Sequence, residues 1–163
     1  MIQWLDDEKQ FDSILAEARR CVYIDSGRIS TELTRLSFDD AGICTARFNE
    51  LLQALMKSGD DEECFFIVLR PDPRLYFYGN FMRFPVLRIK RGTSSQTYLS
   101  MLNEGPTSSP NDSLGTNWWE CLVVSSSRRW FVHALRSDQD NGGHLWVPGE
   151  WISQVLAIYP TTR

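Results

Sequence analysis

Two histidines are the residues of this chain whose chemistry best suits proton transfer or metal binding. His133 and His144 are eleven residues apart, and we place them on two successive strands. If those strands are antiparallel, the two imidazole rings come together and a two-histidine metal site becomes geometrically feasible. Such a site needs a third ligand, for which Asp138 and Asp140 in the intervening loop are the candidates.

The competing interpretation of His133 is a histidine in the interior of a strand. In "WFVHALR" it shares one alternating face with Phe131 and Leu135, which is typical of a buried strand face. We favour this interpretation and expect no metal in the protein. Neither histidine is assigned a catalytic role.

A cysteine nucleophile is the second chemistry to weigh. Cys121 falls in a predicted strand that pairs with the strand of His133, and a nearby histidine would activate a thiol. Against this, Trp119, Cys121 and Val123 alternate along one face that resembles a core. All four cysteines lie in apolar runs without a CxxC spacing, so we expect reduced core thiols; they are Cys21, Cys44, Cys64 and Cys121.

Sequence motifs for other catalytic or cofactor-binding sites are missing. The chain contains no GxxxxGK[ST], GxGxxG, HExxH or GxSxG pattern, so we expect no cofactor. Asp25 ends a predicted strand, where active-site carboxylates occur in open sheets, but a helix cap or turn residue is the interpretation we favour. We therefore lean towards a protein that is not an enzyme.

Tryptophans are concentrated near the end of the chain, in "NGGHLWVPGEW". Trp146 and Trp151 flank Pro148, and we favour the interpretation that both rings anchor this turn to the body of the domain. The alternative is an exposed aromatic patch of Trp130, Trp146 and Trp151 that binds a partner, since tryptophan is common at the centres of protein interfaces. Self-association through exposed tryptophans would make the protein a homo-oligomer.

A small-molecule site is a further alternative. The segment 106–117 is rich in serine, proline, asparagine and glycine, and long loops of this kind are often functional. A ligand pocket beside this loop would make the protein a small-molecule binder or a small enzyme. The residues expected to line it are Tyr76, Tyr78, Arg83, Trp118 and His144.

The helices that position these residues are predicted from hydrophobic periodicity and capping. A first helix is expected over residues 6–20. A second begins at the S-x-x-D signal of Ser37 and Asp40 and ends near Gly59. A short helix begins near Ser94, and "GEWISQVLAI" forms a last helix or strand.

The remaining segments have the character of strands. Residues 21–25 predict a short strand, and "CFFIVLR" predicts a central strand covered on both faces. Residues 74–92 predict two or three strands, and residues 118–136 a hairpin with a serine turn. The order predicts one α+β domain over residues 1–163, with an antiparallel sheet of about five or six strands and two or three helices packed on one face.

The charge is unevenly distributed. Residues 1–64 contain fourteen acidic and seven basic side chains, whereas residues 65–91 contain six basic side chains and one acidic. An acidic first half disfavours nucleic acid and suits a basic protein partner. The acidic residues expected to contact it are Asp39, Asp40, Asp60, Asp61, Glu62 and Glu63.

These features predict a non-catalytic protein-binding module with an acidic surface. The start "MIQWLDDEKQ" lacks a secretory pattern and no apolar run approaches about 20 residues, so we expect a cytoplasmic protein without a membrane span. The profile resembles that of small bacterial binding proteins, immunity proteins of toxin systems among them. This likeness is one of type and no motif carries it.

Overall fold

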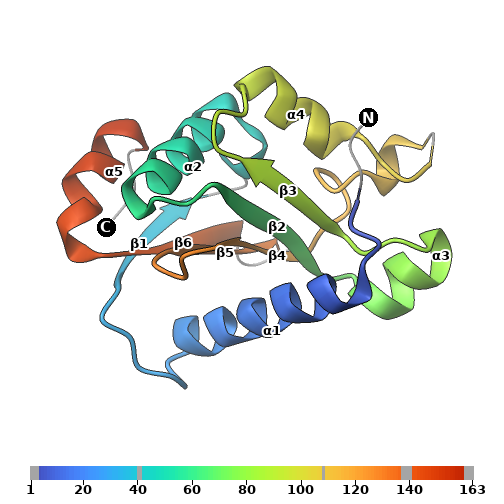
Figure 1. The fold of residues 1–163 in the computed structure, drawn as a ribbon, viewed down its shortest axis with the longest axis horizontal. Helices are drawn as coiled ribbons and strands as arrows, with labels where there is room; N and C mark the ends of the chain where they lie inside the picture. The colour runs from blue at the N-terminus through green and yellow to red at the C-terminus, as the bar shows by residue number, and fades with distance from the viewer. Residues whose placement is uncertain (1–3, 40–41, 108, 137–140, 160–163) are drawn as a thin grey trace.

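The protein is built on one sheet of six antiparallel strands, in the order β1-β6-β5-β4-β2-β3 (Figure 1). The computed structural model describes residues 4–39, 42–107, 109–136 and 141–159. The strands are β1 (Thr34–Asp39), β2 (Glu63–Arg70), β3 (Val86–Lys90), β4 (Glu120–Ser125), β5 (Phe131–Arg136) and β6 (Asn141–Val147). The α-helices are α1 (Glu8–Asp25), α2 (Ala46–Gly59), α3 (Gly79–Phe81), α4 (Ser95–Asn103) and α5 (Ile152–Ile158).

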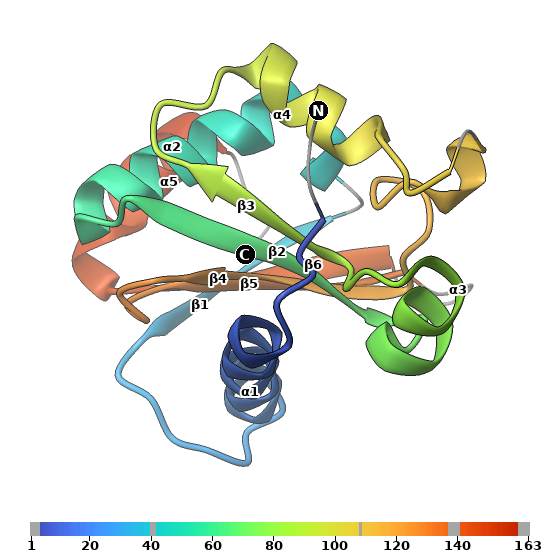
Figure 2. The same ribbon diagram turned by 45° about the vertical axis from the view of Figure 1, so that its right-hand side comes forward.

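The helices cover both faces of the sheet, which confirms the α+β class. Helices α2, α4 and α5 lie together on one face, as predicted, whereas α1 lies by itself across the opposite face (Figure 2). Each face has its own apolar core. Strand β2 contributes to both, because Phe66 faces the α2 side while Phe65 and Ile67 face α1. In the described part of the chain, every helix is too short or too polar to cross a bilayer.

Helix α1 is longer than the sequence predicts. The segment 21–25, expected to be a strand, forms its last turns. Cys21 and Ile24 continue the buried stripe that begins with Phe11 and Ile14, so helical periodicity outweighs the β-propensity of "CVYID". Asp25 is therefore the last residue of a helix and not the end of a strand.

The expected start of the second helix is also wrong. Ser37 belongs to β1, and α2 begins at Ala46, where the side chain of Thr45 accepts a hydrogen bond from the Phe48 amide (3.2 Å). The other half of the S-x-x-D signal, Asp40, lies outside the described residues. The predicted end at Gly59 is confirmed, with Asp60 as the C-cap in the left-handed region (φ 53°).

Residues 73–81, expected to be strands, are helical. A turn of π-helix, η2 (Pro73–Tyr78), leads into α3. The carboxylate of Asp72 caps this segment by accepting the amides of Arg74 and Leu75. A capping aspartate followed by proline at the first helical position is a helix start signal, and here it overrides the aromatic content of the segment.

The three C-terminal strands follow the prediction closely. β4 and β5 form the expected hairpin, and β6 pairs with β5 in a register that sets His144 opposite His133. Trp151 is 7% exposed in the α2-side core, after the 3-10 turn η4 (Gly149–Trp151), while the partly buried ring of Trp146 stacks on Phe131 on the α1 side. These positions agree with the anchoring interpretation.

We predict that Gly143→Ala destabilises the protein by about 1–3 kcal/mol. Gly143 is buried opposite Phe38 in the register of β1 and β6, and a Cβ there would lie 2.3 Å from the Phe38 ring. Gly79→Ala is the matched control, since its Cβ would meet only the Arg74 carbonyl oxygen at 3.5 Å. Urea unfolding of both variants tests this, and equal stability of the two would contradict the packing described.

Candidate functional site

A buried carboxylate organises the polar residues beneath the end of α1. Asp25 accepts hydrogen bonds from His133 Nδ1 (2.7 Å), His144 Nδ1 (2.9 Å) and Trp146 Nε1 (2.8 Å). Burial by itself would raise the pKa of Asp25, but these three donors hold it well below its usual range. The sequence prediction that the two histidines meet on adjacent strands is therefore confirmed, with Asp25 at their centre.

The network continues from His133 to Glu120 at the start of β4 and to Arg70 at the end of β2. His133 Nε2 lies 2.8 Å from Glu120 Oε1, and Arg70 Nε donates to Glu120 Oε2 (2.8 Å). Burial would lower the pKa of His133, but the hydrogen bonds to Asp25 and Glu120 outweigh it and raise the pKa to about 9. The hydrogen bond from His133 in turn lowers the pKa of Glu120. At neutral pH this is a chain of alternating charges.

This arrangement suits structure better than catalysis. Both ring nitrogens of charged His133 are engaged by carboxylates, so the ring has no lone pair for a metal or a proton. Among the described residues, no three or more His, Cys, Asp and Glu side chains are grouped to hold a metal ion. The two aspartates predicted as third ligands, Asp138 and Asp140, lie outside the described residues.

The cysteine–histidine pair is excluded by the register of β4 and β5. His133 pairs with Leu122, whereas Cys121 pairs with Ala134 and lies in the core on the other face of the sheet. Burial raises the pKa of Cys121 well above its ordinary value. It likewise raises the pKa of Cys21, to about 12, and those of Cys44 and Cys64. At neutral pH the four thiols are protonated, and thiols in this state are poor nucleophiles.

The residues expected to line a ligand pocket do not converge. Trp118 is 2% exposed in the α2-side core. Tyr78 stacks on Phe84 on the opposite side of the sheet, where His144 also bonds Asp25. Arg83 is exposed, and Tyr76 accepts a hydrogen bond from the side chain of Asn117 (3.2 Å).

The predicted acidic surface is divided by the structure. Asp60 and Glu62 are exposed, and Glu63 pairs with Arg88 (3.1 Å). Asp61 is only 1% exposed and belongs to the interior. Of the other two acids, Asp39 ends β1 and Asp40 lies outside the described residues.

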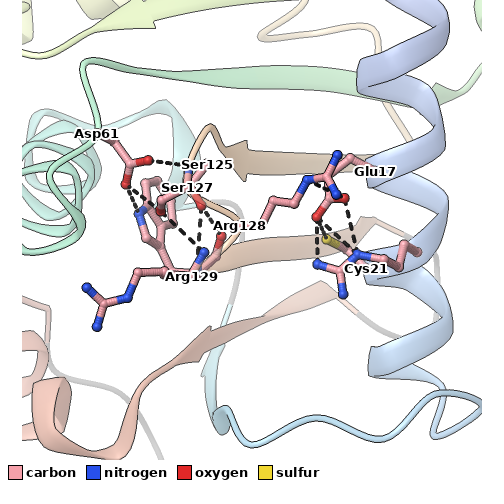
Figure 3. Close-up of polar contacts among 9 residues, drawn as sticks. Glu17, Cys21, Asp61, Ser125, Ser127, Arg128 and Arg129 are labelled. Carbon is pink, nitrogen blue, oxygen red and sulfur yellow. Dashed lines mark hydrogen bonds and ion pairs between the residues drawn. The ribbon is translucent and has the colours of Figure 1, made fainter.

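Asp61 is buried because it holds the β4–β5 turn. It accepts hydrogen bonds from the amide and hydroxyl of Ser127 (Figure 3). It also accepts them from the hydroxyl of Ser126 and from the indole of Trp130 (2.9 Å). A buried carboxylate needs such donors to replace water. The acidic loop and the serine turn, separate in the sequence, therefore form one unit.

The same turn is held from its other side by α1. Glu17, whose side chain is 10% exposed, binds Arg20 (2.7 Å) and Arg128 (3.3 Å), and Cys21 lies beside it (Figure 3). Arg128 adopts a left-handed backbone conformation (φ 61°). Two buried carboxylates from different elements thus fix this turn.

Large apolar side chains are exposed at the opposite end of the sheet, where β2 ends and β4 begins. Leu75 is 83% exposed, Met82 65%, Trp119 55% and Tyr76 37%. Trp119 was expected in the core. It precedes β4 at an irregularity in the β2–β4 register, so the alternation that buries Cys121 and Val123 does not extend to it.

Comparison with known proteins assigns neither a family nor a fold to this chain. The chain matches no protein-family model, no curated protein and no solved structure. The structure itself shows an α+β domain with an antiparallel six-stranded sheet. It also shows the ion-paired network of Asp25, His133 and Glu120, and exposed apolar side chains at one end of the sheet.

We predict that the network around His133 stabilises the protein in a pH-dependent way. Because its pKa rises from 6.5 to about 9 on folding, its contribution is complete below about pH 6.5 and is lost as the pH rises to about 9. A change of this size corresponds to about 3 kcal/mol. The unfolding free energy of wild type should exceed that of His133→Gln by a margin that shrinks between pH 6.5 and 9. A constant margin would contradict the charged state.

We also predict that two neighbouring acids differ sharply in their effect on stability. Asp61→Asn keeps the shape but turns an NH₂ group towards the donors of Ser127 and Trp130, which should cost about 1–3 kcal/mol. Asp60→Asn, at a side chain 97% exposed, should change stability by less than about 0.5 kcal/mol. Thermal unfolding of both variants checks this, and similar losses would refute the anchoring role of Asp61.

Proposed function

We propose that this protein is a non-catalytic protein-binding module, of the inhibitor or immunity type found among small bacterial binding proteins. The observation that carries the proposal is the exposed apolar end, made by Leu75, Tyr76, Met82 and Trp119. Tryptophan and tyrosine are frequent at the energetic centres of protein interfaces. Large exposed apolar side chains on a folded domain can mark a binding surface, and these four lie on η2, at the end of α3 and directly before β4.

The backbone of the apolar end is well fixed, which favours binding. The Trp119 amide donates to the Arg70 carbonyl (2.7 Å), and its carbonyl accepts from the Arg136 amide (2.8 Å). Arg74 joins η2 to α1 through ion pairs with Glu8 and Asp12. A contact surface that is already ordered loses less conformational entropy on binding.

The chemistry of the described residues supports binding over catalysis. The histidine with the most perturbed pKa is engaged at both nitrogens, and the cysteine thiols are protonated at neutral pH. Free cysteines are also typical of a reducing compartment, so we place the protein in the cytoplasm.

We propose a basic partner. Asp6 and Asp7 are exposed at the start of α1, the helix that Arg74 joins to the apolar end. Asp60 and Glu62 lie at the other end of β2 and would act through long-range attraction. Complementary charges around an apolar centre raise the association rate and the specificity of an interface.

The proposal predicts that Trp119→Ala weakens partner binding at least tenfold while the fold is kept. Immobilised wild-type protein would be used to capture its partner from the native host, followed by measurement of Kd for each variant. Tyr23→Ala is the matched control, since Tyr23 is a comparably exposed aromatic (44%) on the far half of α1. Reversing the charges of Asp60 and Glu62 should slow association without abolishing binding.

Equal binding by the Trp119 and Tyr23 variants would overturn the assignment of the apolar end. A partner bound more tightly after charge reversal at Asp60 and Glu62 would overturn the proposed basic character of the partner. The two outcomes test separate parts of the proposal.

A further inference from the structure

A groove of about 500 Å³ lies beside the β4–β5 turn, at the opposite end of the sheet from the apolar end. It is bounded by the second half of α1, the segment 31–33, the turn and the segment 148–150. Three arginines line it, Arg20 from α1 and Arg128 and Arg129 from the turn, together with Thr31 and Glu32. The volume falls within the range of small-molecule sites.

Arg128 occupies a backbone position of the turn that glycine would adopt at lower cost. Its φ of 61° lies in the left-handed region, where glycine is favoured and other residues incur a cost of about 1 kcal/mol. The turn closes through the hydrogen bond from the Arg128 amide to the Ser125 carbonyl (3.2 Å), which glycine would make equally well. What arginine adds over glycine at this position is its guanidinium group.

The pairing with Glu17 leaves N–H donors of both guanidiniums available at the groove. One carboxylate binds two guanidiniums, those of Arg20 and Arg128. The Glu17 side chain is 10% exposed, whereas those of Arg20 and Arg128 are 40% and 64% exposed, so the carboxylate lies beneath and the guanidiniums above it. A guanidinium has five N–H donors, more than the contacts with Glu17 use.

Arg129 adds a third cation that is weakly committed. Its guanidinium stacks over the Trp151 ring at 5.0 Å, and its ion pair with Glu150 is long (3.9 Å) with the Glu150 side chain 74% exposed. Exposed pairs of this kind contribute little, so the contact can give way to a stronger anion.

We propose that this groove binds a small molecule through its phosphate or carboxylate group, with Arg20 and Arg128 as the principal donors and Arg129 as the third. Glu32 and Glu150 also line the groove, so the rest of the ligand carries hydrogen-bond donors or positive charge. The site is independent of the protein-binding function proposed above.

Titration with inorganic phosphate, followed by two-dimensional NMR at constant ionic strength, tests the site. Wild type is expected to show saturable shifts in the millimolar range, centred on residues 20, 31 and 128–129. Arg128→Gly relieves the backbone strain but removes the ion pair with Glu17, so its Tm is measured alongside, and in the folded protein it should weaken phosphate binding at least fivefold. Arg20→Gln should weaken it similarly and keeps the ion pair between Glu17 and Arg128 of the turn.

Arg47→Gln is the matched control, because Arg47 is an exposed arginine on α2, away from the groove. It should bind phosphate as wild type does. Shifts that do not saturate, or equal weakening in all three variants, would reduce the effect to general charge screening and overturn the proposal. Unchanged binding in both Arg128→Gly and Arg20→Gln would overturn it as well.

Discussion

The contact on which the α1 side of the molecule depends is the one between the Asp25 carboxylate and its three donors. A carboxylate at the C-terminus of a helix is opposed by the helix dipole. It is tolerated here because His133, His144 and Trp146 surround it with N–H groups. In return, Asp25 fixes the end of α1 over β5 and β6, and the apolar stripe of the helix is held against the sheet. The two histidines are thus part of the architecture.

The same principle is repeated at two other buried acids. Glu17 binds two arginines, and Asp61 accepts four hydrogen bonds from the turn and from Trp130. A buried charge left without partners would be strongly destabilising. In the sequence, the acidic first half of the chain resembles a binding surface. In the structure, Glu17, Asp25 and Asp61 from this half are buried and hold elements together. The acidic surface that remains exposed is therefore narrower than the composition suggests.

Sequence patterns predicted the sheet better than its connections. The continuous apolar run "CFFIVLR" identified β2, the alternation in "WFVHALR" identified β5, and Ser94 marked the start of α4. Local signals failed where long-range packing decides the outcome. Cys21 continues a helical stripe that only the contact with the sheet makes favourable, and Asp72 followed by Pro73 turns an aromatic segment into a helix.

The candidate site was predictable only in part. The spacing of His133 and His144 indicated that they meet, but not that Asp25 would come from a helix to join them. The burial of Asp61 has no signature in "GDDEE", since one acid among several looks like the others. The exposure of Trp119 follows from a register irregularity that alternation by itself does not reveal. The burial and contacts of a residue can thus be predicted from the sequence only when its partners lie near it in the chain.

The turn between β4 and β5 is gripped by Glu17 from the layer below the sheet and by Asp61 from the layer above it. These two contacts couple the stability of the two apolar cores. If the helix layer on either side separates from this edge of the sheet, it loses its contact with the turn, which the other layer also contacts. The cores on the two faces of the sheet are therefore expected to unfold together and not separately. Amide protons on both sides would exchange with solvent through the same cooperative opening, even though the cores share few side chains.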